Sequence, residues 1–377
     1  MKNARISTPS TDSSSNFSVP VVVFAYNRPR YARNMVSVLR TVKPEHLLIV
    51  ADGPKSDGGR DAQLVEATRY EFEEIDWPCR IECNYSSVNL GCEKRIRSGL
   101  DWAFGIVDQA VILEDDIDAV PEFFYWAQQM LGLYRDRDDI AMICGNNPLI
   151  QWPEGRSDAS AILSRRGGWH GWATYSRAWR AVQDFDLLDY SKSVDDDITL
   201  KGFEPALGAQ FQGWIHKLRL MPERSLAVDV DFALKMAMSG RSAVCSTVNF
   251  IHHLGVGADS THEVNSDDTL FSLPRPKLLI REITQLLPTD AVDNKFDRAR
   301  VLLELLMRAT NPRMAQRLSK HPNLPLDSDV KVHLLPFVHA QETATILNHL
   351  HNEGLDDEKY RYWYSAVSGT PEHGDTP

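Results

Sequence analysis

The chain has 377 residues, of which 43% are hydrophobic and 25% charged, and these are the proportions of an ordinary globular protein. Its length allows one α/β domain and a smaller additional part. The net charge of −11 argues against a general binder of nucleic acids or of anionic membranes.

Several features predict a cytoplasmic protein without a transmembrane segment. The longest apolar runs are far shorter than the roughly 20 residues of a membrane-spanning helix. Residues 1–17 are polar and rich in Ser and Thr, unlike a signal peptide. The cysteines are odd in number and lack the paired spacing of a zinc site, so we expect reduced thiols. They are Cys79, Cys83, Cys92, Cys144 and Cys245.

Residues 1–17 are expected to be disordered, and the chain then alternates between apolar runs and helical periodicity up to about residue 150. Strands are predicted over 19–26, 46–51, 80–85 and 109–114. Helices are predicted over 31–39, 64–75 and 96–104, where apolar residues recur at helical spacing. This alternation is typical of a parallel sheet with helices on both faces.

Polar side chains follow the first, second and fourth of these strands. Tyr26, Asn27 and Arg28 follow the first strand, Asp52 follows the second, and the acidic residues 114–116 end the fourth. Because ligands of parallel sheets bind outside the carboxyl ends of the strands, we expect these residues to meet at one edge. The chain contains neither G-x-G-x-x-G nor G-x-x-x-x-G-K-[ST], which disfavours a dinucleotide fold or a P-loop.

The triplet Glu114-Asp115-Asp116 is the most informative of these motifs. Carboxylates crowded at the edge of an apolar core are costly unless a cation compensates them. Since hard divalent cations bind carboxylate oxygens, the triplet indicates a site where a metal neutralises a diphosphate. The alternative is a solvated acidic turn that caps the next helix.

Basic residues near these strand ends have two interpretations each. The Arg28 guanidinium could hold a phosphate through two hydrogen bonds, or its loop could simply cap a helix that Pro29 begins. Lys94 and Arg95 could add positive charge beside a diphosphate, or could belong to a solvated helix face.

A glycine- and tryptophan-rich loop over residues 167–172 begins a second group of candidate residues. Its glycines allow the backbone to approach a ligand closely, and tryptophan faces stack on sugar rings or bases. A helix is predicted over 176–185. Residues 186–226 are irregular and mixed in charge, as in an insertion or a mobile lid.

Two acidic residues, Asp229 and Asp231, begin a helix that is predicted to run to Ser239. Acidic residues are ordinary caps at such a position, and they need no catalytic role. A strand-like run over 244–254 follows, and a glycine-rich segment that ends in His262 closes it.

The last third of the chain is predicted to be helical and contains no evident chemistry. The best helices are predicted over 278–287, 295–309 and 340–350, and residues 367–377 are expected to be disordered. The wide apolar face of 295–309 indicates core packing or a subunit interface, so these helices could support a homo-oligomer.

Taken in order, several motifs resemble GT-A fold glycosyltransferases that use nucleotide sugars, most closely the N-acetylglucosaminyltransferase I group and its bacterial relatives. Residues 111–124 are similar to that group's E-D-D motif and its following P-x-F-F helix. Weaker similarities involve 89–91 with 96–104, 171–172, and 249–262. The resemblance covers about 18–265, apart from 186–226.

The resemblance implies an α/β GT-A (Rossmann-like) domain over 18–265, with a mostly parallel sheet and flanking helices, and a helical C-terminal extension over 266–366. It implies that Asp116 binds Mn²⁺ or Mg²⁺ and that His262 is a second ligand or a phosphate contact, with a structural or surface histidine as the alternative for His262. Glu114 and Asp115 would face the ribose or sugar, and Asp52 would read the uracil or ribose edge. The full set of donor-binding residues implied is Ala25, Tyr26, Asn27, Arg28, Asp52, Gly91, Lys94, Glu114 and Asp115.

An inverting transferase also needs a carboxylate that removes the proton of the acceptor hydroxyl. The family carries this base in an acidic pair followed by an aromatic residue. In this chain Val230 separates the acids, so Asp231 before Phe232 is preferred and Asp229 stays open. Trp169, His170 and Trp172 are expected to line the sugar or acceptor pocket, with core packing as the alternative for the tryptophans.

The expected activity is transfer of a sugar from a nucleoside-diphosphate donor, preferably a UDP-sugar, to a hydroxyl on a glycan, lipid-linked or protein acceptor. One alternative is a sugar-1-phosphate nucleotidyltransferase, although these enzymes need a glycine-rich loop after the first strand and Tyr26 to Pro29 contain no glycine. Another alternative is a non-catalytic scaffold that binds nucleotide sugars.

Overall fold

The computed structural model describes residues 17–56, 58–147, 161–193, 202–203, 205–220, 226–254, 292–294, 296–297 and 300–301. The chain forms two compact units. The first unit comprises Met1–Phe185, Ala227–Ser266 and Phe271–Val292, and the second comprises Asp186–Leu226, Asp267–Leu270 and Asp293–Pro377. Each unit is described by itself below.

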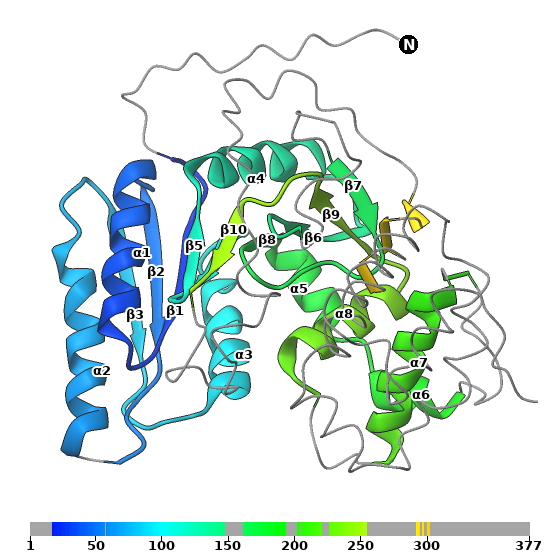
Figure 1. The fold of residues 1–377 in the computed structure, drawn as a ribbon, viewed down its shortest axis with the longest axis horizontal. Coiled ribbons are helices and arrows are strands. Elements are labelled where there is room, and N and C mark those ends of the chain that lie inside the picture. The colour runs from blue at the N-terminus through cyan, green and yellow to red at the C-terminus, as the bar shows by residue number, and fades with distance from the viewer. Residues whose placement is uncertain are drawn as a thin grey trace, which may run out of the picture. The chain divides into compact units, whose positions relative to one another are not determined.

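The first unit is built on an eight-stranded sheet in the order β3-β2-β1-β4-β8-β6-β9-β7 (Figure 1). Its first four strands pair in parallel, as the alternating sequence predicts. They are β1 (Val21–Ala25), β2 (His46–Ala51), β3 (Arg80–Tyr85) and β4 (Gln109–Glu114). The residues of β1 and nearly all of β2 and β4 are buried, which explains their continuous apolar sequences.

The other half of the sheet is mixed, so the whole sheet is mostly parallel, as expected, with β7 and β8 running antiparallel to their neighbours. Strand β8 (Trp172–Tyr175) is antiparallel to both β4 and β6 (Ile140–Cys144). Strand β9 (Ser242–Ser246) is parallel to β6, and β7 (Ala161–Ser164) is antiparallel to β9. Because β7 and β8 have only four residues each, neither carries enough periodicity to be recognised from sequence.

Helices cover both faces of this sheet. They are α1 (Pro29–Val42), α2 (Gly59–Glu71), α3 (Cys92–Ala103), α4 (Pro121–Leu133), α5 (Ser176–Gln183) and α8 (Val228–Met238), with a 3₁₀ turn over Phe72–Glu74. The chain moves toward one side of the sheet from β1 through β2 to β3 and then crosses back to β4 on the other side of β1. Because such crossovers are right-handed, α1 and α2 lie on one face of the sheet and α3 lies on the other. Helix α1 contacts α2 and α4, whereas α8 contacts α3 and α5.

A two-stranded ribbon lies directly after the acidic triplet. Strand β5 (Ile117–Ala119) pairs antiparallel with β10 (Ile251–His253), and the backbone N–H of Leu254 donates to the carbonyl of Asp116 at 2.7 Å. The single strand predicted over 244–254 is therefore two strands, β9 and β10. This pairing brings a segment more than 130 positions downstream against the end of β4.

Aromatic side chains pack between α4 and the segment before β10. Phe123 and Phe124 have ring centroids 5.5 Å apart, and Trp126 lies 5.6 Å from Phe250. Phe17 also joins this core, 5.7 Å from Phe124 and 1% exposed, which corrects the expectation of disorder at this residue, and residues 1–16 lie outside the described residues. Burial of each such ring contributes about 1.5–3 kcal/mol to folding.

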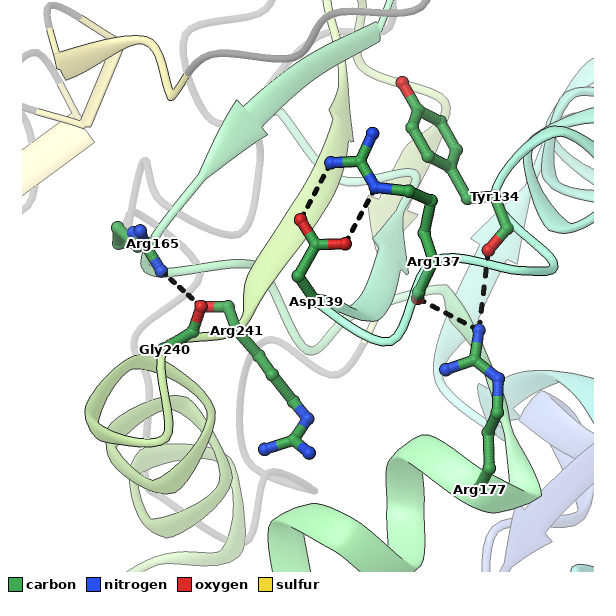
Figure 2. A network of polar contacts seen from close by, with 7 residues as sticks. All are labelled: Tyr134, Arg137, Asp139, Arg165, Arg177, Gly240 and Arg241. Carbon is green, nitrogen blue, oxygen red and sulfur yellow. Dashed lines mark hydrogen bonds and ion pairs between the residues drawn. The ribbon is translucent and has the colours of Figure 1, made fainter.

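Arginines tie together the loops at the amino edge of the sheet, opposite the end of β4 (Figure 2). Arg137 donates to both carboxylate oxygens of Asp139 at 2.7 Å, and Arg177 donates to the carbonyl of Arg137 at 3.0 Å. Arg165 donates to the carbonyl of Gly240 at 2.7 Å, where α8 leads into β9. We call this group the arginine network.

The second unit corrects the prediction that residues 186–226 are irregular. It contains α6 (Leu187–Ser193) and α7 (Pro205–Leu220). Buried residues recur at helical spacing along α7, namely Leu207, Phe211, Ile215 and Leu218. Arg219 Nε of α7 donates to the carbonyl of Ser191 of α6 at 2.6 Å.

Much of the C-terminal third lies outside the described residues, including the helices predicted over 278–287 and 340–350 and the tail 367–377. Within the predicted helix 295–309, the described residues 296–297 and 300–301 are helical and buried. Within the described part of the chain, none of the helices combines the length and apolar character needed to cross a membrane.

Candidate functional site

The polar residues that follow β1, β2 and β4 meet at one edge of the sheet. Strand β1 lies between the other two, with Phe24 beside both Val50 and Glu114. Ala25 is the buried last residue of β1, and its carbonyl accepts the backbone N–H of Asp52 at 3.0 Å. The predicted meeting of these three strand ends is therefore confirmed.

Arg28 is the cation that contacts the acidic triplet. Its Nη1 donates to Asp116 Oδ2 at 2.8 Å, and its Nη2 lies 3.0 Å from Asp115 Oδ1. Both carboxylates are buried, with Asp115 1% and Asp116 7% exposed. The charge compensation that the sequence assigns to a metal is thus supplied here by a guanidinium, whose planar fork suits two acceptors.

One guanidinium leaves this cluster with unbalanced negative charge. Burial, followed by the neighbouring Asp116 and Asp115 carboxylates, raises the pKa of Glu114. Burial likewise raises the pKa of Asp115, although Arg28 acts in the opposite direction. The backbone N–H of Tyr26 adds a hydrogen bond to Asp115 Oδ2 at 3.3 Å. A further cation would offset this negative charge.

Asp116 has an acceptor atom that no donor satisfies. Its Oδ1 is buried and accepts no hydrogen bond, whereas its Oδ2 is held by Arg28. His253 Nε2 of β10 lies 3.7 Å from this Oδ1. Burial, followed by the nearby His170, lowers the pKa of His253 to about 4, so its imidazole is neutral at pH 7. The two histidine rings are 4.8 Å apart.

Asp116 Oδ1 and His253 Nε2 are the donor atoms that could bind a divalent cation at this place. A carboxylate oxygen and a neutral imidazole nitrogen are both ligands for Mn²⁺, and the unsatisfied Asp116 Oδ1 is aimed at this place. Among the described residues, no group of three His, Cys, Asp or Glu side chains is placed to hold a metal ion. The Asp116 carboxylate alone suits Mn²⁺ or Mg²⁺, whereas the His253 imidazole suits a transition metal such as Mn²⁺ and not Mg²⁺. The predicted ligand His262 lies outside the described residues.

Asp52 is buried and bound to backbone amides. Its Oδ1 accepts the N–H groups of Gly53 and Leu90, each at 2.9 Å, and its Oδ2 accepts that of Gly91 at 3.0 Å. Gly53 lies so close to Val88 that a Cβ on Gly53 would be 2.5 Å from backbone atoms of Val88. Asp52 therefore holds the loop before α3. Its carboxylate has about four lone-pair positions, so about one is left for the predicted contact with the uracil or ribose of a nucleotide.

The loop after β1 is held by Asp61, which sequence reasoning missed. Asp61 of α2 accepts the Tyr26 hydroxyl at 2.9 Å, the Asn27 amide at 2.7 Å and the backbone N–H of Lys55 at 2.7 Å. Locally, Asp61 is an ordinary acidic residue in the first turn of a helix, so no sequence signal distinguishes it.

The basic residues of α3 have different positions. Lys94 is exposed, as both of its interpretations allow. Arg95 is 5% exposed and donates to the carbonyl of Ala51 at 3.2 Å and to Asn84 Oδ1 at 2.8 Å. Arg95 therefore lies neither on a solvated face nor in the acidic cluster, because it joins α3 to β2 and β3.

The two candidate bases on α8 lie in different environments. Asp231 Oδ2 is 2.9 Å from Arg97 Nη2 and 3.4 Å from Lys235 Nζ, so two cations flank this carboxylate. Asp229 is exposed, and its charge contributes, after burial and nearer charges, to the raised pKa of Glu114. Asp229 is therefore close enough to the cluster to affect the pKa of Glu114, whereas Asp231 is paired with Arg97 and Lys235.

The aromatic residues divide into core and surface. Trp172 is 1% exposed, and its ring lies 4.6 Å from Trp169 and 5.5 Å from Phe232. Trp172 is therefore a core residue, which leaves Trp169 and His170, both partly exposed, as candidates for a pocket wall. Gly171, between His170 and Trp172, has a φ of +62° and lies against Ile251, so that a Cβ on Gly171 would be 2.3 Å from an Ile251 side-chain carbon.

Comparison with known proteins adds no family to this description, since neither the family models nor the curated proteins searched match the chain. The functional argument therefore rests on the side chains at the carboxyl edge. Of the predicted residues, the structure brings together Arg28, Asp115 and Asp116, and it adds His253.

Proposed function

We propose that this protein is a GT-A fold glycosyltransferase that moves a sugar from a nucleoside diphosphate to an acceptor hydroxyl. The observation that carries the proposal is a buried acidic pair, at the end of a central parallel strand, that combines a bound guanidinium with an unsatisfied carboxylate oxygen. Such a place offers a cation for phosphate oxygens and ligands for a metal. Parallel sheets bind ligands at this edge.

Asp116, with His253 beside it, would hold the divalent cation. When bound, Mn²⁺ or Mg²⁺ offsets the negative charge that develops on the departing nucleoside diphosphate. Arg28 would bind a phosphate oxygen, and Glu114 and Asp115 would face the ribose or sugar hydroxyls. Asp61 and Asp52 act indirectly, since they hold the loops that carry Tyr26 and Gly91.

Asp229 would act as the general base in a single displacement that inverts the sugar carbon. The acceptor oxygen forms a bond to that carbon, the bond from the carbon to the diphosphate oxygen breaks, and the hydroxyl proton moves to the Asp229 carboxylate. Asp229 suits this role because it is exposed at the first turn of α8 and near the cluster. Asp231, held by Arg97 and Lys235, would position the helix instead.

The donor is proposed to be a UDP-sugar, and the acceptor a glycan, lipid-linked or protein hydroxyl, in the cytoplasm. Trp169 would offer a ring face to a sugar, because it covers Trp172 and remains partly exposed. A homo-oligomer through the C-terminal helices stays a prediction from the sequence.

Turnover of a panel of nucleotide sugars, with and without Mn²⁺, tests this proposal. We expect Mn²⁺-dependent release of one nucleoside diphosphate, slowly by hydrolysis and faster with an acceptor. Release of pyrophosphate from NTP and a sugar phosphate would instead identify a nucleotidyltransferase. Binding without turnover of any donor, across glycan, lipid-linked and peptide acceptors, would favour the scaffold and contradict the proposal.

A further inference from the structure

Arg28 and a divalent cation compete for the same carboxylates. The guanidinium bridges Asp115 and Asp116 at 3.0 and 2.8 Å, so a metal that bound both residues would have to displace it. Only Asp116 Oδ1 stays open on that pair. A cation that arrived while Arg28 remained in place would also be repelled by its charge.

The Arg28 side chain is placed to change partners. Its backbone carbonyl accepts the N–H groups of Tyr31 and Ala32 at 3.0 and 3.1 Å, so the start of α1 anchors the main chain. Its side chain, in contrast, is 19% exposed and packs over the Tyr31 ring at 5.4 Å. The side chain is therefore partly accessible to solvent, and it can change partners by rotation while the main chain stays in place.

Two buried or partly buried arginines of α3 are already engaged elsewhere. Arg95 binds the carbonyl of Ala51 and the side chain of Asn84, and Arg97 binds Asp231. Within the described residues, Arg28 is therefore the guanidinium that contacts the triplet and can also meet a diphosphate.

We propose that Arg28 is a resident counter-ion that exchanges its partner when substrate binds. In the empty protein it neutralises Asp115 and Asp116, and with a nucleoside diphosphate present it turns to the phosphate and leaves these carboxylates to the metal. This inference rests on the proposed function. It predicts that metal and diphosphate strengthen each other's binding. The diphosphate binds the Arg28 side chain that the metal displaces, and the metal binds the carboxylates that Arg28 leaves.

The predicted coupling is reciprocal and measurable. Saturating UDP should tighten Mn²⁺ binding to the protein by about 10-fold or more, after correction for the Mn²⁺–UDP complex in solution, and Mn²⁺ should tighten UDP binding by the same factor. Titration calorimetry on the wild-type chain measures both. Equal affinities with and without the second ligand would overturn the proposal without any variant.

Substitution of Arg28 separates this mechanism from simple metal-bridged binding. Arg28→Gln should bind Mn²⁺ alone about 10-fold more tightly than wild type, because the competing cation is gone, and its coupling with UDP should be smaller than in wild type, because only direct contact between metal and diphosphate remains. Arg33→Gln is the matched control: Arg33 is on α1, exposed and paired with Glu71, so the same charge is lost elsewhere. Its Mn²⁺ affinity should stay at the wild-type value.

The outcomes distinguish the two proposals. If UDP and Mn²⁺ bind together but Arg28→Gln, folded by circular dichroism, binds Mn²⁺ no more tightly, the exchange fails and the proposed function stands. If no nucleotide binds while pyrophosphate and Mn²⁺ show coupling that Arg28→Gln reduces, the exchange stands and the proposed function fails. Should Arg28→Gln not fold, Arg28→Lys replaces it, because an ammonium cannot bridge two carboxylates as the guanidinium fork does, and it should also bind Mn²⁺ alone more tightly than wild type.

Discussion

Aspartates pair with arginines at both edges of the sheet, and the two groups differ in burial and in how fully they are satisfied. In the arginine network, Arg137 holds both oxygens of Asp139, whose side chain is 50% exposed (Figure 2). At the end of β4, Arg28 contacts one oxygen of Asp115 and one oxygen of Asp116, both of which are buried, and Asp116 Oδ1 has no hydrogen bond.

The two edges also shift carboxyl pKa values in opposite directions. Hydrogen bonds from Arg137 lower the pKa of Asp139, because its ionised form is fully paired. Burial raises the pKa of Asp115, because its ionised form is only partly paired. The same residue types thus hold loops together at the amino edge and, at the carboxyl edge, leave a buried carboxylate oxygen without a hydrogen bond.

The largest expected contrast lies within α8. Asp229→Asn should lower the rate of sugar transfer by about 10²–10⁴-fold while UDP affinity is retained, because only the base is lost. Asp231→Asn should have a much smaller effect on the rate, since Arg97 and Lys235 occupy that carboxylate. Steady-state kinetics on the two variants measure this difference, and the opposite ranking would restore Asp231 as the base.

A second contrast concerns the histidines of β10. His253→Ala should weaken Mn²⁺ binding in the presence of UDP by about 10–100-fold, because its Nε2 faces Asp116 Oδ1. His252, the adjacent residue on the strand, points to the other side, so His252→Ala is the control. Calorimetric titration of Mn²⁺ provides the readout, and equal losses in the two variants would argue against His253 as a ligand.

A third contrast compares stability rather than binding. Asp52→Ala removes the acceptor of three backbone N–H groups and should lower the free energy of unfolding by about 1–3 kcal/mol. The loop before α3 should also become more susceptible to proteolysis. Urea denaturation measures the change, and a loss below about 0.5 kcal/mol would mean that water replaces these contacts.

The smallest effect is expected in the arginine network. Asp139→Asn breaks an exposed ion pair, so it should change the free energy of unfolding by about 0.2–1 kcal/mol. Nucleotide and metal affinities should not change, since this edge lies opposite the site. An altered Mn²⁺ affinity in this variant would mean that the two edges are coupled.

The parallel half of the sheet could be predicted because its strands are recognisable from the residues within each strand. Buried strands such as β1 and β4 read as continuous apolar runs, and the end of each parallel strand places its polar residues at a known edge. Arg28 and the triplet were found in this way. The choice between a metal and Arg28 as counter-ion depends on side-chain geometry, which spacing does not encode.

The remaining site residues depend on long-range pairing. His253 reaches Asp116 only because β10 pairs with β5, and that three-residue pairing leaves no recognisable pattern. Asp229 and Asp231 are equivalent as helix caps, and Arg97, 134 positions away from Asp231, makes them different. Trp172 reads as a loop residue because β8 is too short to show strand periodicity.

Calorimetric titration of UDP, with and without Mn²⁺, into the wild-type chain, Asp116→Asn and Asp139→Asn tests the central claim most directly. The account predicts micromolar UDP binding that requires Mn²⁺ in the wild type, persists in Asp139→Asn and disappears in Asp116→Asn. UDP binding that ignores Mn²⁺, or that survives in Asp116→Asn, would contradict a metal-linked nucleotide site at the end of β4.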